Sequence, residues 1–547
     1  FMFHQSAIEE LFSVLFVIFF FFISMVSRGE TYFIATNGDD RSAGTIDSPF
    51  GTFSHAIDIA QPGDTIFVRG GLYLLDSTVR VDKPAASSAR ICLWAYENEE
   101  PVLDFRNNSR HDNPPQPRDD DSIEGTSDAL GIFIAPGSDW WHIKGLTIQD
   151  APYYGIRVYG SNNIFERLVL RDNQASGLEI TGKEDHAPGN NLVKDCDSYL
   201  NFDPQTNGED ADGFAAKFET LGPGNVFSGL RAYSNSDDGY DFWHATNPVL
   251  IENCWSFDNG FFRPEWQEEV NGSWRGDGLG FKLGQDASEL TLNHNVAFGN
   301  KAYGIDANGN NSTGGVVINN ATLVNNAKNG NPVQIQLNDG SPHTVRNTIA
   351  FDVDGDDNTI ISPEVDDAFN TWNGIGVSAG DFVSINMDDL YEDATAPRNA
   401  DGSFPEIGLQ LDPSSPLIDA GIDVGLPYFG PAPDLGAFEV GLTGIWDTGN
   451  PSAENKITLK TSPNPFTNNT VISFELDYSG VADLNIYNLY GEEIRCLSSA
   501  WFAAGSHSIM WDCTDGEGKK VEEGMYLIAL TTKRAQQTVK VVKIKVN

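Results

Sequence analysis

The chain has few cysteines, and their positions argue against two common ways of stabilising a fold. Five occur among 547 residues: Cys92, Cys196, Cys254, Cys496 and Cys513. Their spacing matches neither a regular disulfide framework nor a zinc site. We interpret Cys196 and Cys254 as small buried hydrophobic residues, and the sequence leaves a pairing of Cys496 with Cys513 open.

Basic residues are also scarce. The chain has 34 Lys and Arg against 78 Asp and Glu, which gives a formal net charge of −44. An acidic surface repels polyanions, so we expect no nucleic-acid partner and no anionic membrane partner. A polyanionic substrate would fit only if a cation bridged it to the protein. We expect the chain to act as a monomer.

Long apolar runs are missing except near the start of the chain. Residues 11–26 are almost wholly apolar, and the small residues Ser24 and Ser27 lie at or just after the end of this run. Because a membrane span needs about 20 residues, we interpret residues 1–27 as a signal peptide, with an uncleaved anchor as the alternative. Basic residues before the run are lacking, and Phe1 in place of Met suggests a truncated start.

A repeat runs through the middle of the chain. Six segments end in asparagine at intervals of 28, 34, 24, 41 and 26 residues: Asn173, Asn201, Asn235, Asn259, Asn300 and Asn326. Four of them carry an aromatic residue two positions earlier: Tyr199, Tyr233, Phe257 and Phe298. Asparagine tolerates left-handed backbone, and its amide bonds to neighbouring turns. We therefore expect a parallel β-helix with stacked asparagines at its corners and stacked aromatics in its core. A β-sandwich is the alternative, but it would not keep register over six turns.

The ends of the repeat region indicate the domain organisation. Phe53, Ala56, Ile57 and Ala60 fall at helical spacing before a Pro-Gly pair, which predicts a short helix over the open end of the β-helix. The repeat region is expected to end at residues 433–439. The fold class is thus all-β: a right-handed parallel β-helix with an N-terminal capping helix over 28–440, a linker over 441–456 and a small β-sandwich over 457–547.

The C-terminal segment carries a second set of motifs. The sandwich strands are expected at 457–459, 470–476, 482–487, 507–511 and 525–530. Its landmarks are Ser462-Pro463-Asn464-Pro465-Phe466, 486–491, Trp511-Asp512, Gly524-Met525-Tyr526 and the basic end 540–545. Together they resemble a type IX secretion C-terminal sorting domain. The resemblance implies export by the type IX machinery and a secreted or cell-surface location in a Gram-negative bacterium. An ordinary carbohydrate-binding sandwich is the alternative.

Acidic residues and lysines recur at matched places in the repeat. Three Asp-Gly pairs precede short strand-like segments: Asp212-Gly213, Asp238-Gly239 and Asp277-Gly278. Aligned on the aspartate, two of them carry a lysine five residues later, Lys217 and Lys282. Stacked repeats bring matched positions together, which predicts an acidic site with a lysine beside it. Asp212, Asp237, Asp238 and Asp241 would supply hard oxygen ligands for calcium, since so many close carboxylates could not all stay ionised alone. Solvated Asp-Gly turns are the alternative.

The same segments carry a resemblance over most of residues 30–440. Residues 212–217, 222–227, 235–241 and 276–283 resemble the core of polysaccharide lyase family 9, the pectate-lyase-like β-helix enzymes. The resemblance implies one calcium ion on Asp212, Asp237, Asp238 and Asp241, with Lys282 as the catalytic base. It further implies β-elimination on an acidic uronate polymer, pectate (polygalacturonate).

The chemistry of such a reaction gives the lysines different expected roles. A uronate lyase removes the weakly acidic proton at C5, and lysine accepts it only when neutral. Lys282 lies one coil after the acidic cluster and is favoured as the base, while Lys217 suits a salt bridge or a substrate carboxylate. We assign substrate binding to Lys217, Trp243, His244, Arg263 and Arg275, with Trp266 in the same group of loops.

Three other functions remain open at this point. A lyase on alginate or a glycosaminoglycan would use the same chemistry. An inverting β-helix hydrolase would use paired aspartates such as Asp237 and Asp238, but the Gly-His-Gly and Arg-Ile-Lys motifs of the pectin hydrolases are absent. A non-catalytic glycan-binding protein would share the fold and would not need Lys282.

Overall fold

The structure is a computed structural model. It describes the residues 29–109, 127–182, 185–218, 220–285, 289–309, 315–328, 330, 332–337, 341–354, 358–440, 458–476, 480–488, 493–502, 505–516, 519–532 and 536–545. The predicted signal peptide 1–27 and linker 441–456 lie outside these residues. Within them, no helix is long and apolar enough to cross a membrane. The domain limits stay predictions.

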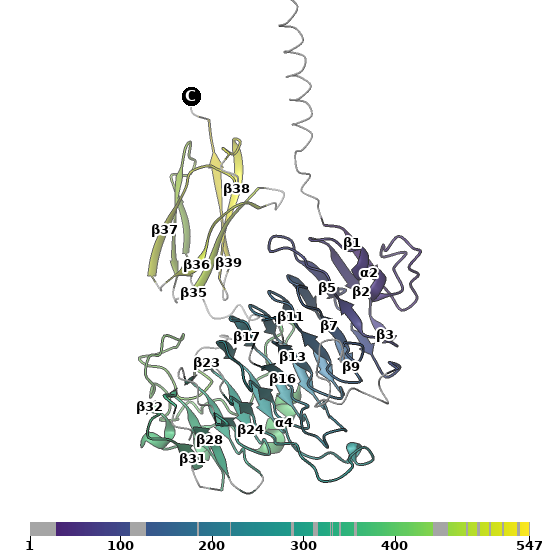
Figure 1. Ribbon diagram of the computed structural model, residues 1–547. Helices are drawn as coiled ribbons and strands as arrows, with labels where there is room; N and C mark the ends of the chain where they lie inside the picture. Colours follow the sequence, from purple (N-terminus) through teal and green to yellow (C-terminus); the bar gives the residue numbers. More distant parts are fainter. Residues whose placement is uncertain are drawn as a thin grey trace, which may run out of the picture. The chain divides into compact units, whose positions relative to one another are not determined.

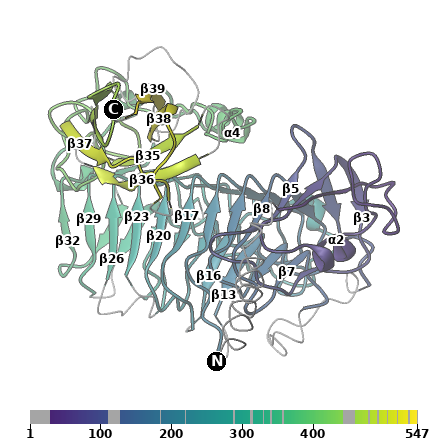
Figure 2. The same cartoon turned by 90° about the horizontal axis from the view of Figure 1, so that it is seen from above.

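Most described strands belong to three parallel sheets that the chain visits in turn (Figures 1 and 2). Sheet A contains β1 (Thr31–Ile34), β2 (Thr65–Val68), β5 (Ile91–Ala95), β8 (Trp141–Lys144), β11 (Ile164–Glu166), β14 (Leu192–Lys194), β17 (Asn225–Ser228), β20 (Val249–Glu252), β23 (Leu290–Asn293), β26 (Val316–Asn319), β29 (Thr344–Arg346) and β32 (Asp366–Ala368). Sheet B contains β4 (Val79–Val81), β7 (Ile132–Ile134), β10 (Ile156–Val158), β13 (Leu178–Thr181), β16 (Phe214–Lys217), β19 (Tyr240–Asp241), β22 (Phe281–Lys282), β25 (Ile305–Asp306), β28 (Val333–Leu337) and β31 (Asn358–Ile361). Sheet C contains β3 (Gly71–Leu74), β6 (Pro101–Asp104), β9 (Thr147–Gln149), β12 (Val169–Arg171), β15 (Asp197–Tyr199), β18 (Arg231–Tyr233), β21 (Trp255–Phe257), β24 (Val296–Phe298), β27 (Thr322–Val324) and β30 (Ile349–Phe351).

This order is that of a right-handed parallel β-helix, as the repeat predicts. From β4 to β27 each coil contributes one strand to sheet B, one to sheet A and one to sheet C. Each internal strand therefore pairs with the equivalent strand of the coils before and after it. The interior is filled by apolar side chains of fully buried residues, such as Ile156, Leu178 and Phe227.

The six repeated asparagines form a continuous buried ladder. Each Nδ2 donates to the Oδ1 of the asparagine in the next coil, over 2.8–3.1 Å, from Asn173 to Asn326. The ladder ends on Oε1 of Gln334, 3.0 Å from Nδ2 of Asn326. The left-handed backbone lies one residue before each asparagine, at positions such as Leu200 and Ser234, with φ of 56° at both. The ladder residues themselves therefore serve as hydrogen-bonding links between coils.

The repeated aromatics also stack, and Phe257 and Phe298 are buried as expected, but the stack faces away from the interior of the coils. Tyr199, Tyr233, Phe257 and Phe298 have ring centroids 4.7–4.8 Å apart in successive coils. Their neighbours Ser198 and Ser256 point inward and donate to the carbonyls of Gly213 and Gly280, which directly precede strands of sheet B. Because alternate side chains of a strand face opposite ways, the aromatic stack lies on the outer face of sheet C. The interior stack is Phe214, Tyr240 and Phe281.

The N-terminal end of the β-helix is covered as expected. Helix α2 (Phe53–Ile59) begins after Thr52, whose Oγ1 accepts the backbone N–H of His55 at 3.2 Å. Phe53, Ala56 and Ile57 are its buried residues. Figure 1 shows the helix beside β1 and β2 at this end.

The coils end earlier than the predicted residues 433–439. The last strand of the three sheets ends at Ala368. The chain then forms η3 (Thr371–Asn373), η4 (Ala379–Asp381) and α4 (Met387–Thr395), while η2 (Pro264–Trp266) lies in an earlier loop. The segment around residue 436 packs back on the last coils: the N–H of Gly436 donates to the carbonyl of Asn347 at 2.7 Å. Residues 433–439 thus belong to a segment that covers the last coils of the β-helix.

The C-terminal part is an antiparallel sandwich. One sheet has β33 (Thr458–Ser462), β34 (Thr470–Leu476) and β37 (Gly505–Trp511); the other has β36 (Glu493–Phe502), β35 (Gly480–Tyr487), β38 (Gly524–Thr532) and β39 (Gln536–Lys543). The sequence did not predict β36 and β39. The core includes Phe466, Ile472, Leu484 and Trp511. Cys496 is exposed and Cys513 buried, and neither forms a disulfide.

Removal of one ladder amide should destabilise the protein. Asn300 is fully buried, its Nδ2 donates to Ser256 and Asn326, and its Oδ1 accepts from Asn259. In Asn300→Ala several of these buried groups lose their partners, so we expect the free energy of unfolding to fall by about 3 kcal/mol. Denaturant unfolding followed by circular dichroism measures this, with the exposed Asn107→Ala as control. Equal stability of the two variants would contradict the role of the ladder.

Candidate active site

Three neighbouring strands of sheet B position the predicted site. Ala215 of β16, Asp241 of β19 and Lys282 of β22 are partners in the parallel register. The residues before Asp241 and Lys282, Tyr240 and Phe281, are buried and stacked in the interior. Alternation along each strand therefore turns Asp241 and Lys282 to the outer face of sheet B. Lys282 lies one coil beyond Asp241, which agrees with its expected placement after the acidic cluster.

The alignment of the three Asp-Gly pairs is wrong for the third pair. The N–H of Phe214 donates to Gly239 and that of Tyr240 to Gly280, so Gly213, Gly239 and Gly280 share one column. Asp277-Gly278 lies two residues earlier. Lys282 therefore stacks on Asp241 and does not take the place of Lys217. Glycines at 276, 278 and 280 gave the sequence several equivalent alignments.

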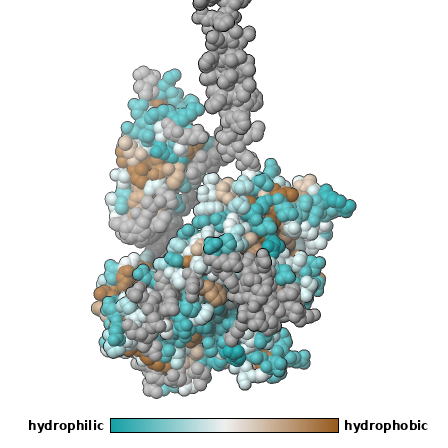
Figure 3. Space-filling view, viewed as in Figure 1, coloured by the Kyte–Doolittle hydropathy of each residue, from teal (hydrophilic) through white to brown (hydrophobic). Residues whose placement is uncertain are grey.

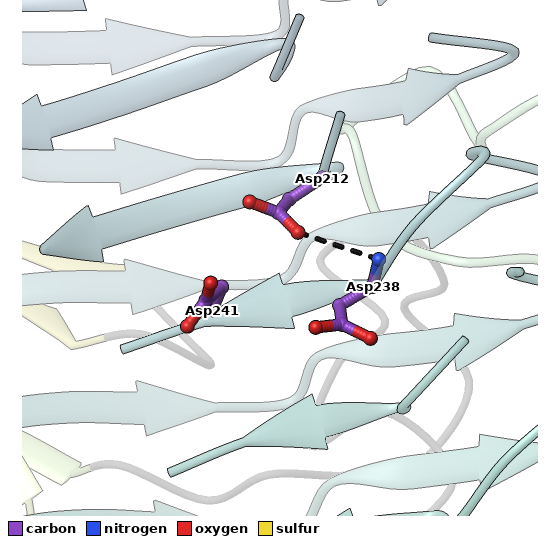
Figure 4. Close-up of side chains that lie close together, drawn as sticks. All are labelled: Asp212, Asp238 and Asp241. Carbon is purple, nitrogen blue, oxygen red and sulfur yellow. Dashed lines mark hydrogen bonds between the residues drawn. The ribbon is translucent and has the colours of Figure 1, made fainter. Parts of the chain in front are cut away.

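Three of the four predicted metal ligands converge. Carboxylate oxygens of Asp212, Asp238 and Asp241 lie within 4.8 Å of one another (Figure 4). Asp212 and Asp238 are fully buried, and Asp241 is 3% exposed. The backbone N–H of Asp238 donates to Oδ1 of Asp212 at 3.3 Å, the bond drawn in Figure 4. This contact and the stacked coils hold the carboxylates together.

Asp237 lies beside this group but is held differently. Its Oδ1 accepts the N–H of Asp277 at 2.7 Å, and its Oδ2 accepts the N–H of Asp210 at 3.1 Å. Burial and the neighbouring Asp238 nevertheless raise its pKa well above the usual value. Asp237 therefore joins the loops around residues 210 and 277 to the cluster.

Both lysines point at the cluster. Nζ of Lys217 lies 2.7 Å from Oδ2 of Asp212 and 2.7 Å from Oδ2 of Asp241. Nζ of Lys282 lies 3.0 Å from Oδ2 of Asp238 and 3.6 Å from Oδ2 of Asp241. Burial alone would lower both lysine pKa values, but the carboxylates outweigh it and hold them well above the usual range. Both ammonium groups are charged in this arrangement.

The positive charge of the two lysines does not balance the cluster. Four aspartates and two lysines carry −4 + 2 = −2 formal charges when all are ionised. Burial raises the pKa of Asp238 to about 7, although Lys282 is close. Oδ2 of Asp238 has the ion pair with Lys282 at 3.0 Å and accepts no further hydrogen bond within the part of the chain that the structure describes. A divalent cation with a preference for oxygen ligands fits both the missing charge and the donor set, and calcium is such a cation.

The residues assigned to substrate binding fall into two groups. Arg263 pairs with Asp258, and Arg275 pairs with Glu209. Trp266 is 6% exposed and stacks on Phe202 at 4.7 Å. These three therefore make contacts that stabilise the loop after β21. Trp243 and His244 differ: they follow Asp241 at the end of β19, are half-buried, and the N–H of Trp243 donates to Oδ1 of Asp241 at 2.9 Å.

The sequence did not single out a buried ion pair on the same face of sheet B. Arg157 of β10 and Glu179 of β13 are register partners, 3.2 Å apart between Nη2 and Oε1. Both are at most 1% exposed, and the charge of Glu179 contributes to the raised pKa of Lys217. The available signal was that Arg157 and Glu179 occupy the same position in two similar segments, 155–158 and 177–180, which begin 22 residues apart.

Comparison with known proteins agrees with this architecture. The family model for the Pel9A-like right-handed β-helix region matches residues 32–354, and the FlgD Ig-like domain model matches 461–536. Pectate lyase L of Dickeya dadantii is 34% identical over 76% of this chain and 92% of its own length. Pectate lyase PEL9 of Emericella nidulans is 32% identical, over 72% and 94%.

Solved structures give the same result. The crystal structure of pectate lyase Pel9A is 33% identical, with a TM-score of 0.63 over 76% of this chain and 97% of that one. A rhamnogalacturonan lyase at 23% identity and a TM-score of 0.56 shares the fold. The fold, the site and these relatives define a polysaccharide lyase. Within that class, the chain belongs to the Pel9A-like right-handed β-helix family.

Lys217 should be needed for stability when no metal is present. In Lys217→Met, Asp212 and Asp241 lose their nearest positive charge while still buried. Breaking a buried ion pair in this way costs about 3 kcal/mol. Thermal unfolding in excess chelator should show a clearly lowered midpoint. The control is Lys194→Met, because the side chain of Lys194 is 47% exposed. Equal midpoints of thermal unfolding for Lys217→Met and this control would refute the expectation.

Proposed function

We propose that this chain cleaves pectate by β-elimination, with calcium as cofactor and Lys282 as base. The observation that carries the proposal is the buried cluster of Asp212, Asp238 and Asp241 with Lys282 on the outer face of sheet B. Pectate lyases share about a third of its residues over most of its length.

The proposed calcium ligands are Asp212, Asp238 and Asp241, with Asp237 as the fourth after a change in its present contacts. Calcium held there would bind a uronate carboxylate and stabilise the negative charge that develops beside C5. Without such a cation, the four aspartates and two lysines would present a formal charge of −4 + 2 = −2 to an acidic polymer. The high negative charge of the protein is thus compatible with a polyanionic substrate through this one site.

Lys282 has the chemistry required of the base. Its Nζ takes the proton from C5, the electron pair of that C–H bond forms the C4–C5 double bond, and the C4–O bond breaks. The leaving oxygen receives a proton from solvent. In the present arrangement Asp238 and Asp241 hold the pKa of Lys282 high. Lys282 becomes a base only when a nearby cation offsets these carboxylates, so the calcium and the lysine act together.

Lys217 is less suited to the same task. It contacts two carboxylates at 2.7 Å, whereas the contacts of Lys282 are 3.0 and 3.6 Å. The side chain of Lys217 is 10% exposed and that of Lys282 is 14%. We propose that Lys217 holds Asp212 and Asp241 in position, and that Trp243 and His244 line the path of the polymer.

The other candidate functions have less support. A hydrolase that used Asp237 and Asp238 has no support among the relatives reported above, which are pectate lyases. A non-catalytic binding protein would not need Lys282 beside the acidic cluster on the outer face of sheet B. A lyase on another uronate polymer differs only in the loops that contact the sugar, so a substrate panel must separate it from a pectate lyase.

Loss of Lys282 should remove the reaction without removing the fold. We expect Lys282→Ala to lower turnover of polygalacturonate about a thousandfold or more, because the proton at C5 loses its acceptor. Lys282→Arg should fail nearly as badly, since arginine stays protonated. The wild-type rate should rise with pH as Lys282 loses its proton. The ultraviolet absorbance of unsaturated ends measures turnover, with Lys194→Ala as control.

Products with saturated ends only, or a Lys282→Ala enzyme that keeps most of its turnover, would overturn this assignment. Faster production of unsaturated ends from alginate or a glycosaminoglycan than from polygalacturonate would keep the mechanism and change the substrate.

Calcium should be required for the same reaction. Excess chelator is expected to abolish activity on polygalacturonate, and added calcium should restore it, because the cluster lacks two positive charges. Asp241→Asn should raise the calcium concentration needed for half-maximal activity at least tenfold. Undiminished activity in excess chelator would contradict the proposed role of calcium. The proposed role of Lys282 is tested separately by the Lys282 variants.

The C-terminal sandwich has a separate proposed role. We propose that residues 457–547 are a type IX sorting domain, that 1–27 is a signal peptide, and that the enzyme is released or displayed by a Gram-negative cell. The motifs around Pro463, Trp511 and Gly524 support this, as does a basic end in an acidic chain. The proposed site residues all belong to the β-helix.

Truncation tests that role. A chain ending at Val440 should keep its specific activity within about twofold, because no proposed site residue is removed. In the native host the same truncation should leave the enzyme inside the cell envelope. Immunoblots of medium and cell fractions measure this; unimpaired export of the truncated chain would refute the sorting role, and lost activity in a folded truncated chain would reveal a catalytic one.

A further inference from the structure

The loop after β15 carries oxygen-bearing side chains at alternate positions. They are Asp203, Gln205, Asn207 and Glu209, followed by Asp210, and the segment 202–212 contains no Lys or Arg. The order Asp203-x-Gln205-x-Asn207-Gly208 follows the start of a calcium loop, Asp-x-Asx-x-Asx-Gly, except for Gln at the third position. This pattern alone would also suit a solvated turn.

Two buried side-chain oxygens in this loop accept no hydrogen bond from the residues that the structure describes. Asp203 is 1% exposed; its Oδ1 accepts the N–H groups of Gln205 at 2.7 Å and Thr206 at 3.4 Å. Its Oδ2 is buried and accepts no hydrogen bond from any residue described here, and the same holds for Oε1 of Gln205. Buried oxygens without a donor cost free energy. Burial also raises the pKa of Asp203 to about 7.

The loop is closed and held in place. The N–H of Gly208 donates to the carbonyl of Asp203 at 2.9 Å, and Gly208 has φ of 99°, a left-handed conformation that favours glycine. The ring of Trp274 lies against Gly208, so close that a Cβ there would be 2.6 Å from it. Asn207 is already engaged, because its Oδ1 accepts the N–H of Asn271 at 2.7 Å. Among the described residues, Asp203 and Gln205 thus each have a side-chain oxygen left for a ligand.

We propose that Asp203 and Gln205 are ligands of a second divalent cation, calcium, in the loop 203–209. Carboxylate and amide oxygens are the donors that calcium takes, together with backbone carbonyls and water. A bound cation would supply the partner that both buried oxygens lack and would keep Asp203 ionised. The inference stands on this loop and does not depend on the proposed calcium at Asp212, Asp238 and Asp241.

Such a cation would also hold in place two backbone segments that contact the active site. The residue after the loop, Asp210, donates its N–H to Oδ2 of Asp237 at 3.1 Å. The carbonyl of Asn207 accepts the N–H of Arg275 at 3.0 Å, two residues before Asp277, whose N–H donates to the other oxygen of Asp237. The cation in this loop would therefore fix the two backbone segments that hold Asp237.

Calcium titration of the full chain tests the proposal. Isothermal calorimetry and equilibrium dialysis would compare wild-type with Asp203→Asn, which keeps the shape of the side chain and removes its charge. We expect Asp203→Asn to bind one calcium ion fewer than wild-type. Gln205→Ala should keep the number of sites and weaken one of them about tenfold. Asp241→Asn serves as the matched variant in the other cluster and should weaken a different site at least tenfold, so that the double variant is impaired at both.

Terbium luminescence locates the second site. Trp274 lies against Gly208, so light absorbed by tryptophan should excite Tb³⁺ in the loop, and Trp274→Phe should remove that part of the signal without removing the binding. Unchanged calcium number and affinity in Asp203→Asn and Gln205→Ala would overturn the proposal. If Asp203→Asn does not fold, the calcium titration of Gln205→Ala and the terbium luminescence of Trp274→Phe test the proposal. If Asp241→Asn binds like wild-type while Asp203→Asn loses a site, the active-site calcium fails and the loop site stands.

Discussion

The register between coils is the constraint on which the rest of this structure depends. The buried asparagine ladder joins each coil to the next by side-chain hydrogen bonds of 2.8–3.1 Å. Because the coils stay in register, residues 24 to 41 positions apart in sequence become neighbours. Asp212, Asp241 and Lys282 meet only for this reason, and a shift of one residue in any coil would turn one of them inward.

The candidate site, like the whole chain, has an excess of negative charge. The protein has a net charge of −44, and its described surface is mostly hydrophilic on the face shown in Figure 3. At the cluster, buried carboxylates outnumber ammonium groups, and burial raises the pKa of Asp238 to about 7. A cation that resolves this excess would also make an acidic polymer a suitable ligand and would allow Lys282 to give up its proton.

Insertions between coils support the site from outside. The segment from β21 to β22 is longer than an ordinary coil, and it packs through Trp266 and Trp274 on Phe202. Its backbone then reaches the cluster, where Leu279 donates its N–H to Oδ1 of Asp238 at 2.6 Å. Arg275, for which sugar binding stays a prediction, pairs in this structure with Glu209 of a neighbouring loop.

The sequence by itself determined the β-helix, the capping helix and the identity of the clustered acids, because repeats of Asn and Asp-Gly record which positions stack. It did not determine the column of Lys282, the outer position of Tyr199 and Phe257, or the partners of Arg263. The position of Lys282 depends on which of several glycines precedes its strand. The position of the two aromatic residues depends on which face of sheet C they take, and the partner of Arg263 depends on which loop packs beside it. Such choices are made by contacts between residues far apart in the chain, so only the tertiary structure decided them.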